Sequence, residues 1–311
     1  MATIKILDNK ATSNRLMIGE NTIHFMDLQK GLDDDGKAVI IEEAMHVLKQ
    51  CIRPKVDDNI TNIAVGYVQS GKTLSFTTLT ALAADNGWRI VVYLTGTKTN
   101  LQEQTSKRLQ KDLDIDNTDT YRMYTNIIDS VSIVNNARNF LKLSDEVLLF
   151  PILKHYKHIS RLANIFAQLH PELEGKGCII IDDEADQSSF NTYAKKNSQS
   201  EEWEEDEFSK TYSAILELKN SLPNHSYVQY TATPQAAFLI DNNDILSPKY
   251  HTVLTPGKGY TGGKEFFKNK ERNVIEVIPD DQINDPKKPL ESLPPTLIEA
   301  LKEFLVSVAI V

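Results

Sequence analysis

One segment constrains the fold of this chain more than any other: residues 66–73, which read GYVQSGKT. They match the pattern G-x-x-x-x-G-K-[ST] at every fixed position, and an apolar stretch rich in β-branched residues, 60–65, comes directly before them. Residues 73–85 then carry apolar side chains at helical spacing, and the pattern stops at Asn86 and Gly87. A strand, a glycine-rich turn and a helix in this order predict an α/β fold with a phosphate-binding loop.

The residue types in this loop fit the phosphates of a nucleotide. Backbone N–H groups of a glycine-rich turn point at a phosphate, and the following helix adds the positive end of its dipole. We therefore expect ATP here, with Lys72 reaching the β- and γ-phosphates and Thr73 holding Mg²⁺ through its hydroxyl. The residues expected to bind ATP are Gly66, Val68, Gln69, Ser70, Gly71, Lys72 and Thr73.

A second motif supplies the carboxylates that such a site needs. Residues 178–181 form an apolar run that predicts a buried strand, and carboxylates follow where that strand would end. Parallel α/β sheets bind their ligands at this edge. We expect Asp183 to hold Mg²⁺ and Glu184 to polarise the attacking water, so that Glu184 and Lys72 are the predicted catalytic residues. Asp182 is expected to be a structural neighbour.

Short apolar runs alternate with amphipathic segments from residue 60 onward. The alternation predicts βαβ units and a mostly parallel sheet with helices on both faces. We divide the chain into an N-terminal helical and irregular extension (1–58), an ATPase core (59–250), and a turn-rich connection with the start of a further domain (251–311). Because the last segment, 295–311, is an apolar helix without a cap, we expect the chain to be a fragment. Other expected helices lie at 37–52, 100–111, 131–143 and 156–169, and other expected strands at 89–94, 120–124, 147–150 and 227–230.

Composition bounds the partners and the compartment. The 43 acidic residues against 34 basic ones give a net charge of −9, which argues against a generally basic surface, so any contact with nucleic acid would be a local patch. The two cysteines, Cys51 and Cys178, lie far apart and predict neither a disulfide framework nor a zinc site. With no signal-peptide pattern and no apolar run of membrane length, we expect a cytoplasmic protein without a membrane span.

Further motifs carry a resemblance to known families. Residues 183–186 read DEAD and residues 230–234 read YTATP, and these resemble the acidic box and the threonine motif of superfamily-two helicases. The combination of these motifs with three other segments resembles the Z-one domain, a bacterial and viral family described as endonuclease-like and found beside helicase-like and defence proteins. The match spans residues 60–311, and the three other segments are 68–73, 94–109 and 256–267.

The resemblance implies a RecA-like, helicase-like P-loop ATPase core in which Thr231 and Thr233 couple the nucleotide state to movement of a second core domain. It also implies that the turn after residue 94 contacts a nucleic-acid backbone, expected to be DNA, although an ordinary polar loop fits this turn equally well. The donors there are Thr95, Thr97, Lys98 and Asn100.

Two-domain motors of this kind complete their site with an arginine from the second domain. The only arginine after residue 234 is Arg272, in a polar turn. We therefore expect the second RecA-like domain to lie in a missing C-terminal part, and hydrolysis by this chain alone to be weak.

Two alternative functions stay open. The family description suggests a Mg²⁺-dependent endonuclease, but Asp280 and Asp281 lack a following E-x-K partner, so cutting is assigned to a possible nuclease partner. The other alternative is an ATP-dependent switch or scaffold without motor activity. Glu184 argues against pure binding, because a domain that only holds nucleotide needs no positioned base.

Overall fold

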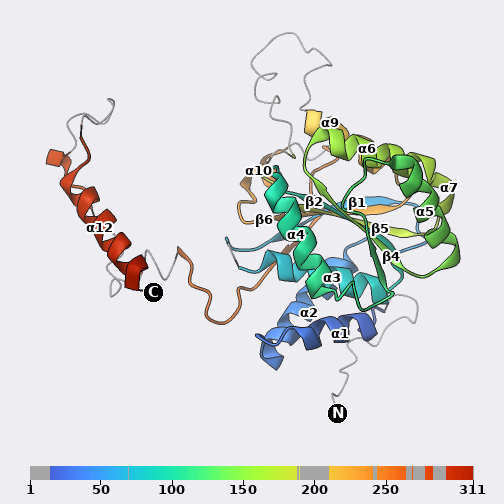
Figure 1. Ribbon diagram of the computed structural model, residues 1–311, viewed down its shortest axis with the longest axis horizontal. Coiled ribbons are helices and arrows are strands. Elements are labelled where there is room, and N and C mark those ends of the chain that lie inside the picture. Colours follow the sequence, from blue (N-terminus) through green and yellow to red (C-terminus); the bar gives the residue numbers. More distant parts are fainter. Residues whose placement is uncertain are drawn as a thin grey trace, which may run out of the picture. The chain divides into compact units, whose positions relative to one another are not determined.

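The computed structural model describes residues 15–68, 70–187, 189, 210–240, 244–263, 268, 277–282 and 292–310. The chain divides into two compact units, Met1–Lys258 and Gly259–Val311. The first unit has an α/β fold, and the second contains the 3-10 helix η2 (Asp280–Gln282) and the helix α12 (Pro295–Ile310) (Figure 1). The predicted C-terminal helix is thereby confirmed.

A seven-stranded sheet forms the centre of the first unit, in the order β3-β4-β2-β5-β6-β1-β7. Every strand pair is parallel, as the alternation of strands and helices predicted. The seventh strand was not predicted, because it is a short edge strand with a single buried side chain, Thr252. The strands are β1 (Asn59–Val65), β2 (Trp88–Thr95), β3 (Tyr121–Met123), β4 (Val147–Leu153), β5 (Gly177–Asp183), β6 (His225–Thr231) and β7 (Tyr250–Val253).

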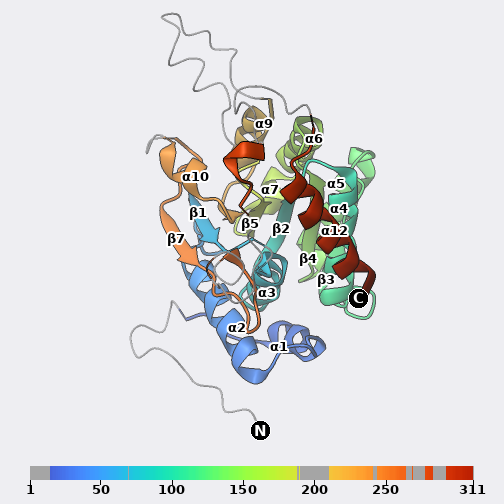
Figure 2. The ribbon, with the colours of Figure 1, turned by 90° about the vertical axis from the view of Figure 1, so that its left-hand side faces the viewer.

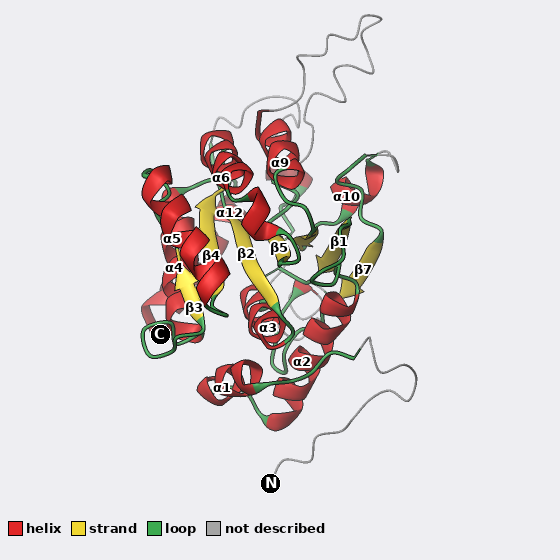
Figure 3. Ribbon diagram, turned by 90° about the vertical axis from the view of Figure 1, so that its right-hand side faces the viewer, coloured by secondary structure: helices red, strands yellow, loops and turns green. Residues whose placement is uncertain are grey.

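Helices cover both faces of the sheet, which confirms the predicted layers. In β2, Ile90, Val92 and Leu94 belong to one hydrophobic cluster and Val91 and Tyr93 to the other, because side chains alternate along a strand. Figures 2 and 3 show α1, α2 and α3 on one side of the strands and α6 and α9 on the other. One face carries α1 (Glu20–Leu28), α2 (Asp34–Lys49), α3 (Lys72–Asp85) and α4 (Thr99–Asp112), and the other carries α5 (Ser130–Leu143), α6 (Tyr156–Gln168), α7 (His170–Leu173) and α9 (Lys210–Asn220).

The helix that follows the phosphate loop, α3, is buried along most of its length. Hydroxyls at Thr77, Thr78 and Thr80 each donate to the carbonyl oxygen four residues earlier, at 2.8–2.9 Å, so these polar side chains are satisfied within the helix. The helix ends at Asp85, and Gly87 follows with φ +87°, as the glycine signal predicted. Core packing therefore holds the start of α3 in place.

The N-terminal segment packs onto this helix, and its first helix, α1, was not predicted. Phe25 and Met26 of α1 are buried in the same hydrophobic cluster as Phe76. Instead of a local side chain, the Asp85 carboxylate at the end of α3 accepts hydrogen bonds from the backbone N–H groups of Gly19 (2.8 Å) and Thr22 (3.0 Å). A cap supplied from so far along the chain leaves no local sequence signal.

None of the helices in the described residues is both long enough and apolar enough to cross a membrane. The two cysteines, Cys51 and Cys178, are buried free thiols.

Candidate functional site

The predicted site residues gather at the carboxyl edge of the sheet. Strands β5, β6 and β1 are neighbours, and their register places Val65 beside Thr231 and Asp183 beside Tyr230. The N–H of Gly66 donates to the carbonyl oxygen of Thr231 over 3.0 Å, so the phosphate loop starts against the end of β6. The predicted phosphate loop (66–73), the acidic turn (183–186) and the threonine motif (230–234) therefore meet at one edge, where parallel sheets bind ligands.

Two glycines shape the phosphate loop. Gly71 precedes α3 with φ +96°, a left-handed conformation that strains any residue with a side chain. A Cβ at Gly66 would lie 3.1 Å from the Ser70 hydroxyl oxygen and 3.2 Å from Cγ of Lys72, which leaves little space for a side chain. Val68 is exposed, and Gln69 lies outside the described residues.

Lys72 and Glu184 join the loop to the acidic turn. Lys72 is the first residue of α3 and only 8% exposed, and its Nζ lies 3.2 Å from Oε1 of Glu184. Glu184 directly follows β5 with φ +51°, a conformation that few non-glycine residues adopt. The backbone there turns sharply, and the Glu184 carboxylate reaches the phosphate loop.

Asp183, the last residue of β5, is a partly buried carboxyl group. Burial raises the pKa of Asp183 to about 6, the negative charge of Glu184 adds to this effect, and the charges of Lys154 and Lys72 oppose it. Close to neutral pH this carboxylate is ionised at a cost, and a cation beside it would favour the ionised form.

A buried lysine, Lys154, binds the backbone of the acidic turn, a role that the sequence did not indicate. Lys154, at the end of β4, is 2% exposed, and its Nζ lies 2.6 Å from Oδ1 of the fully buried Asp182. The same ammonium donates to the carbonyl oxygens of Asp183 (2.6 Å), Glu184 (2.9 Å) and Gln187 (3.3 Å). These partners satisfy a buried charge and fix the backbone that carries Glu184. The only local sign of this role in the sequence is a lysine directly after the apolar run 147–153.

The acidic turn is also bonded to the threonine motif. Asp186 accepts hydrogen bonds from the hydroxyls of Thr231 (2.7 Å) and Thr233 (2.6 Å), one on each carboxylate oxygen. Burial raises the pKa of Asp186, but the hydrogen bonds from Thr233 and Thr231 outweigh burial, so the pKa lies below its ordinary value. The N–H of Ala185 donates to the carbonyl oxygen of Tyr230 over 3.0 Å. Asp186 is thus the acceptor for both predicted coupling threonines, a role the sequence did not reveal.

The turn after β2 divides its predicted residues between the interior and the surface. Thr95 is buried, and its hydroxyl donates to the carbonyl oxygen of Ile152 over 2.9 Å. Thr97, Lys98 and Asn100 are exposed at the start of α4. Of the four residues predicted to contact a nucleic-acid backbone, these three are available to solvent.

A cluster of aromatic and cationic side chains lies around Tyr156, at the turn after β4. The His155 ring centroid is 4.6 Å from that of Tyr156, and the ammonium groups of Lys157 and Lys210 lie 5.9 and 5.5 Å from the Tyr156 ring. These side chains are termed the Tyr156 cluster. His155, Tyr156 and Lys157 lie just after β4, the strand that pairs with β2, and Lys210 is the first residue of α9. The turn after β4 is therefore next to the turn that carries Lys98, a proximity that the sequence did not indicate.

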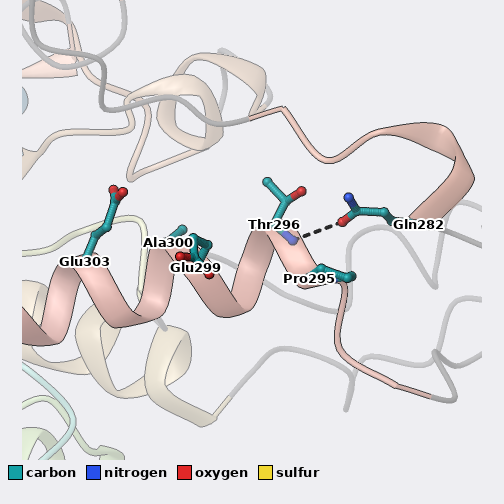
Figure 4. Close-up of a pocket in the computed structure, with 6 residues that line it drawn as sticks. All are labelled: Gln282, Pro295, Thr296, Glu299, Ala300 and Glu303. Atoms are coloured by element: carbon teal, nitrogen blue, oxygen red, sulfur yellow. Dashed lines mark hydrogen bonds between the residues drawn. The ribbon is translucent and has the colours of Figure 1, made fainter.

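A separate depression on the second unit carries none of the predicted site residues. The N–H of Thr296 donates to Oε1 of Gln282 across it over 3.0 Å (Figure 4). Two carboxylates, Glu299 and Glu303, are among the described residues that line it. Its lining residues are Gln282, Pro295, Thr296, Glu299, Ala300 and Glu303.

Comparison with known proteins gives limited similarity. No family model matches the chain, and no curated protein matches it. Among solved structures, the DUF1998 helicase MrfA bound to DNA is similar with 14% identity and a TM-score of 0.45 over 77% of this chain and 30% of that chain. A second structure of DUF1998 helicase MrfA gives 15% identity and a TM-score of 0.42 over 80% of this chain and 34% of that chain.

The chain thus spans about a third of the length of these helicase structures. At these values the likeness assigns no function to this chain, and the resemblance to the Z-one domain stays a prediction.

Proposed function

We propose that this chain is a helicase-like ATPase domain that binds ATP with Mg²⁺ and hydrolyses it while acting on a nucleic acid, expected to be DNA. The observation that carries the proposal is the 3.2 Å ion pair between Lys72 and Glu184. It brings the predicted phosphate-binding cation and the predicted base together at the sheet edge where parallel folds bind ligands.

The donor set at this edge fits Mg²⁺, which prefers oxygen ligands and keeps several waters. The hydroxyl of Thr73 and the carboxylate of Asp183 would hold it. Burial raises the pKa of Asp183 to about 6, and a divalent cation beside this carboxylate would favour its ionised form. When bound, Mg²⁺ would neutralise charge on the β- and γ-phosphates.

Lys72 and Glu184 have linked roles in hydrolysis. A lysine ammonium that bonds to a phosphate oxygen has to share or give up its carboxylate partner. Phosphate binding at Lys72 would therefore free the Glu184 carboxylate to accept a proton from the attacking water. The Lys154 hydrogen bonds to the carbonyl oxygens of Asp183 and Glu184 would hold the backbone that carries this carboxylate while its partner changes.

Asp186 links the proposed nucleotide site to the threonine motif. Because its two oxygens accept from Thr231 and Thr233, a shift of the acidic turn acts directly on the segment after β6. In this proposal the two threonines transmit the shift to a second core domain.

The nucleic-acid contact is assigned to the adjacent turns after β2 and β4. Thr97, Lys98 and Asn100 offer donors of the kind that bond to phosphate oxygens. The Tyr156 cluster adds cations and an aromatic ring, the groups that hold single strands by charge and stacking. The endonuclease alternative gains no comparable observation, since Asp280 and Asp281 lie exposed in η2.

ATP turnover by the purified chain, with and without single-stranded DNA, tests the proposal. We expect measurable hydrolysis that DNA stimulates, and loss of at least about a hundred-fold in Lys72→Ala and Glu184→Gln, because each removes a group aligned with the reacting phosphate. Lys49→Ala, which alters an exposed lysine on α2, is the matched control and keeps wild-type turnover. Hydrolysis that survives Lys72→Ala contradicts the proposal, and turnover indifferent to every nucleic acid favours the switch alternative.

A further inference from the structure

An arginine from a neighbouring helix points at the phosphate loop. Nη1 of Arg108, on α4, lies 3.4 Å from Oγ1 of Thr73 and donates a hydrogen bond to it. Thr73 is the residue to which Mg²⁺ is assigned above, so a second cationic side chain besides Lys72 stands at the start of α3. Arg108 lies in segment 94–109, one of those that resemble the Z-one domain, but its residue pattern alone indicates no role for it.

Core packing of helix α4 fixes the backbone position from which the Arg108 side chain extends. The next residue, Leu109, is fully buried, and Leu113 is 2% exposed. Both belong to the hydrophobic cluster that includes Phe76 and Leu79 of α3. Helix α4 is thus packed on the same face of the sheet as α3, and its exposed Arg108 extends over the beginning of that helix.

The Thr73 hydroxyl accepts only one of the hydrogen bonds that the Arg108 guanidinium can donate. A guanidinium carries five N–H donors in a planar fork that matches phosphate oxygens in pairs, whereas a threonine hydroxyl is a single neutral acceptor. If the Thr73 hydroxyl held Mg²⁺, the metal ion and the Arg108 guanidinium would be two positive groups side by side. Their repulsion would disfavour the hydrogen bond between Arg108 and Thr73. The phosphate oxygens of a bound nucleotide would then be better acceptors for the guanidinium than the Thr73 hydroxyl.

We propose that Arg108 is a phosphate-contacting residue of the nucleotide site, supplied by the same chain, and that it recognises the terminal phosphate of a nucleoside triphosphate. The inference rests on the proposed function. Thr73 would hold the Mg²⁺ that neutralises charge on the β- and γ-phosphates, so a group beside Thr73 would lie near the end of the phosphate chain. Arg108 therefore distinguishes ATP from ADP.

Equilibrium binding of fluorescent ATP and ADP analogues to the full chain, in Mg²⁺, tests this role. We expect Arg108→Ala to weaken ATP binding about ten- to hundred-fold and ADP binding less than about three-fold, as for the loss of a charge-assisted hydrogen bond to one phosphate. Arg108→Lys should recover part of the affinity, because it keeps the charge without the fork. Lys107→Ala is the matched control, since it removes the adjacent exposed cation on the same helix, and its affinities stay at the wild-type values.

The outcomes separate this inference from the proposal on which it rests. If the unaltered protein binds neither nucleotide, the proposed function fails and Arg108 has no phosphate to contact. If it binds both, and Arg108→Ala with an unchanged melting temperature binds ATP as well as wild type, the inference alone fails. An equal loss for ATP and ADP also overturns it, because that result describes a local electrostatic effect, such as the one Arg108 exerts on Asp112, and not recognition of the terminal phosphate.

Discussion

Single charges at the carboxyl edge of the sheet are each held by a partner from a different segment of the chain. Lys72 is paired with Glu184, Lys154 with Asp182, and Asp186 with two threonine hydroxyls. Asp183 is the exception, since burial and the neighbouring Glu184 act against its ionised form. A carboxylate kept at such a cost is typical of a functional site.

Asp183 provides a prediction at this scale. Its pKa is about 6 in the folded protein against an ordinary value of 3.8, so the folded state binds the proton more tightly and ionised Asp183 opposes folding. The penalty is absent below pH 4, grows between pH 4 and 6, and is complete above pH 6. Asp183→Asn should therefore raise the free energy of unfolding at pH 7.5 by up to about 3 kcal/mol and leave it unchanged at pH 4.

Urea denaturation of both proteins at the two pH values measures the effect. Asp57→Asn, at an exposed position, is the control and should change stability by less than about 0.5 kcal/mol at either pH. A destabilised Asp183→Asn at pH 7.5 would show that ionised Asp183 is favoured by its surroundings.

The residues that sequence could predict are those that belong to local patterns. Gly66, Lys72 and Glu184 stand in motifs whose order along the chain already implies a common edge. Lys154 and Arg108 could not be assigned in this way, because their roles depend on which strand and which helix lie side by side. That information is in the packing of the fold and not in local spacing.

At the scale of elements, hydrophobic patterning predicted most of the helices and strands. The sheet strands were found because buried parallel strands are continuous apolar runs, as in β2 and β5. The missed elements are α1, α7, α9, α10 (Gln235–Leu239), β7 and the 3-10 helix η2, and of these α7, α10, β7 and η2 are at most five residues long. The cap of α1 comes from Asp85, β7 has one buried residue, and α9 was not separated from the acidic segment before it.

The tie between β4 and the acidic turn provides the prediction at this scale. Lys154→Met leaves the Asp182 charge buried without its ammonium partner, and we expect it to lower the free energy of unfolding by about 3–5 kcal/mol. The double variant Lys154→Met with Asp182→Asn should recover part of this loss, because no unpaired charge stays buried. Lys142→Met, which breaks a half-exposed ion pair with Glu172, is the control, with an expected loss of about 1 kcal/mol or less.

Denaturant unfolding compares these three variants with the wild-type protein. A loss in Lys154→Met no larger than in Lys142→Met would mean that Lys154 does not support the acidic turn.

At the scale of the whole molecule, the first unit is a complete parallel sheet with helices on both faces, and its predicted nucleotide site lies along one edge of that sheet. The phosphate loop, the acidic turn and the threonine motif are far apart in the sequence and meet only because β1, β6 and β5 are neighbours.

The central claim is that this edge binds Mg²⁺ and ATP through Lys72, and binding itself is the most direct test. Isothermal titration of ATP into the purified chain, in Mg²⁺ and then in EDTA, measures it without any need for turnover. We predict one ATP bound per chain in Mg²⁺, affinity at least about ten-fold lower in EDTA, and no detectable binding by Lys72→Ala with unchanged melting temperature. Binding of ATP by Lys72→Ala at the wild-type affinity would contradict the account.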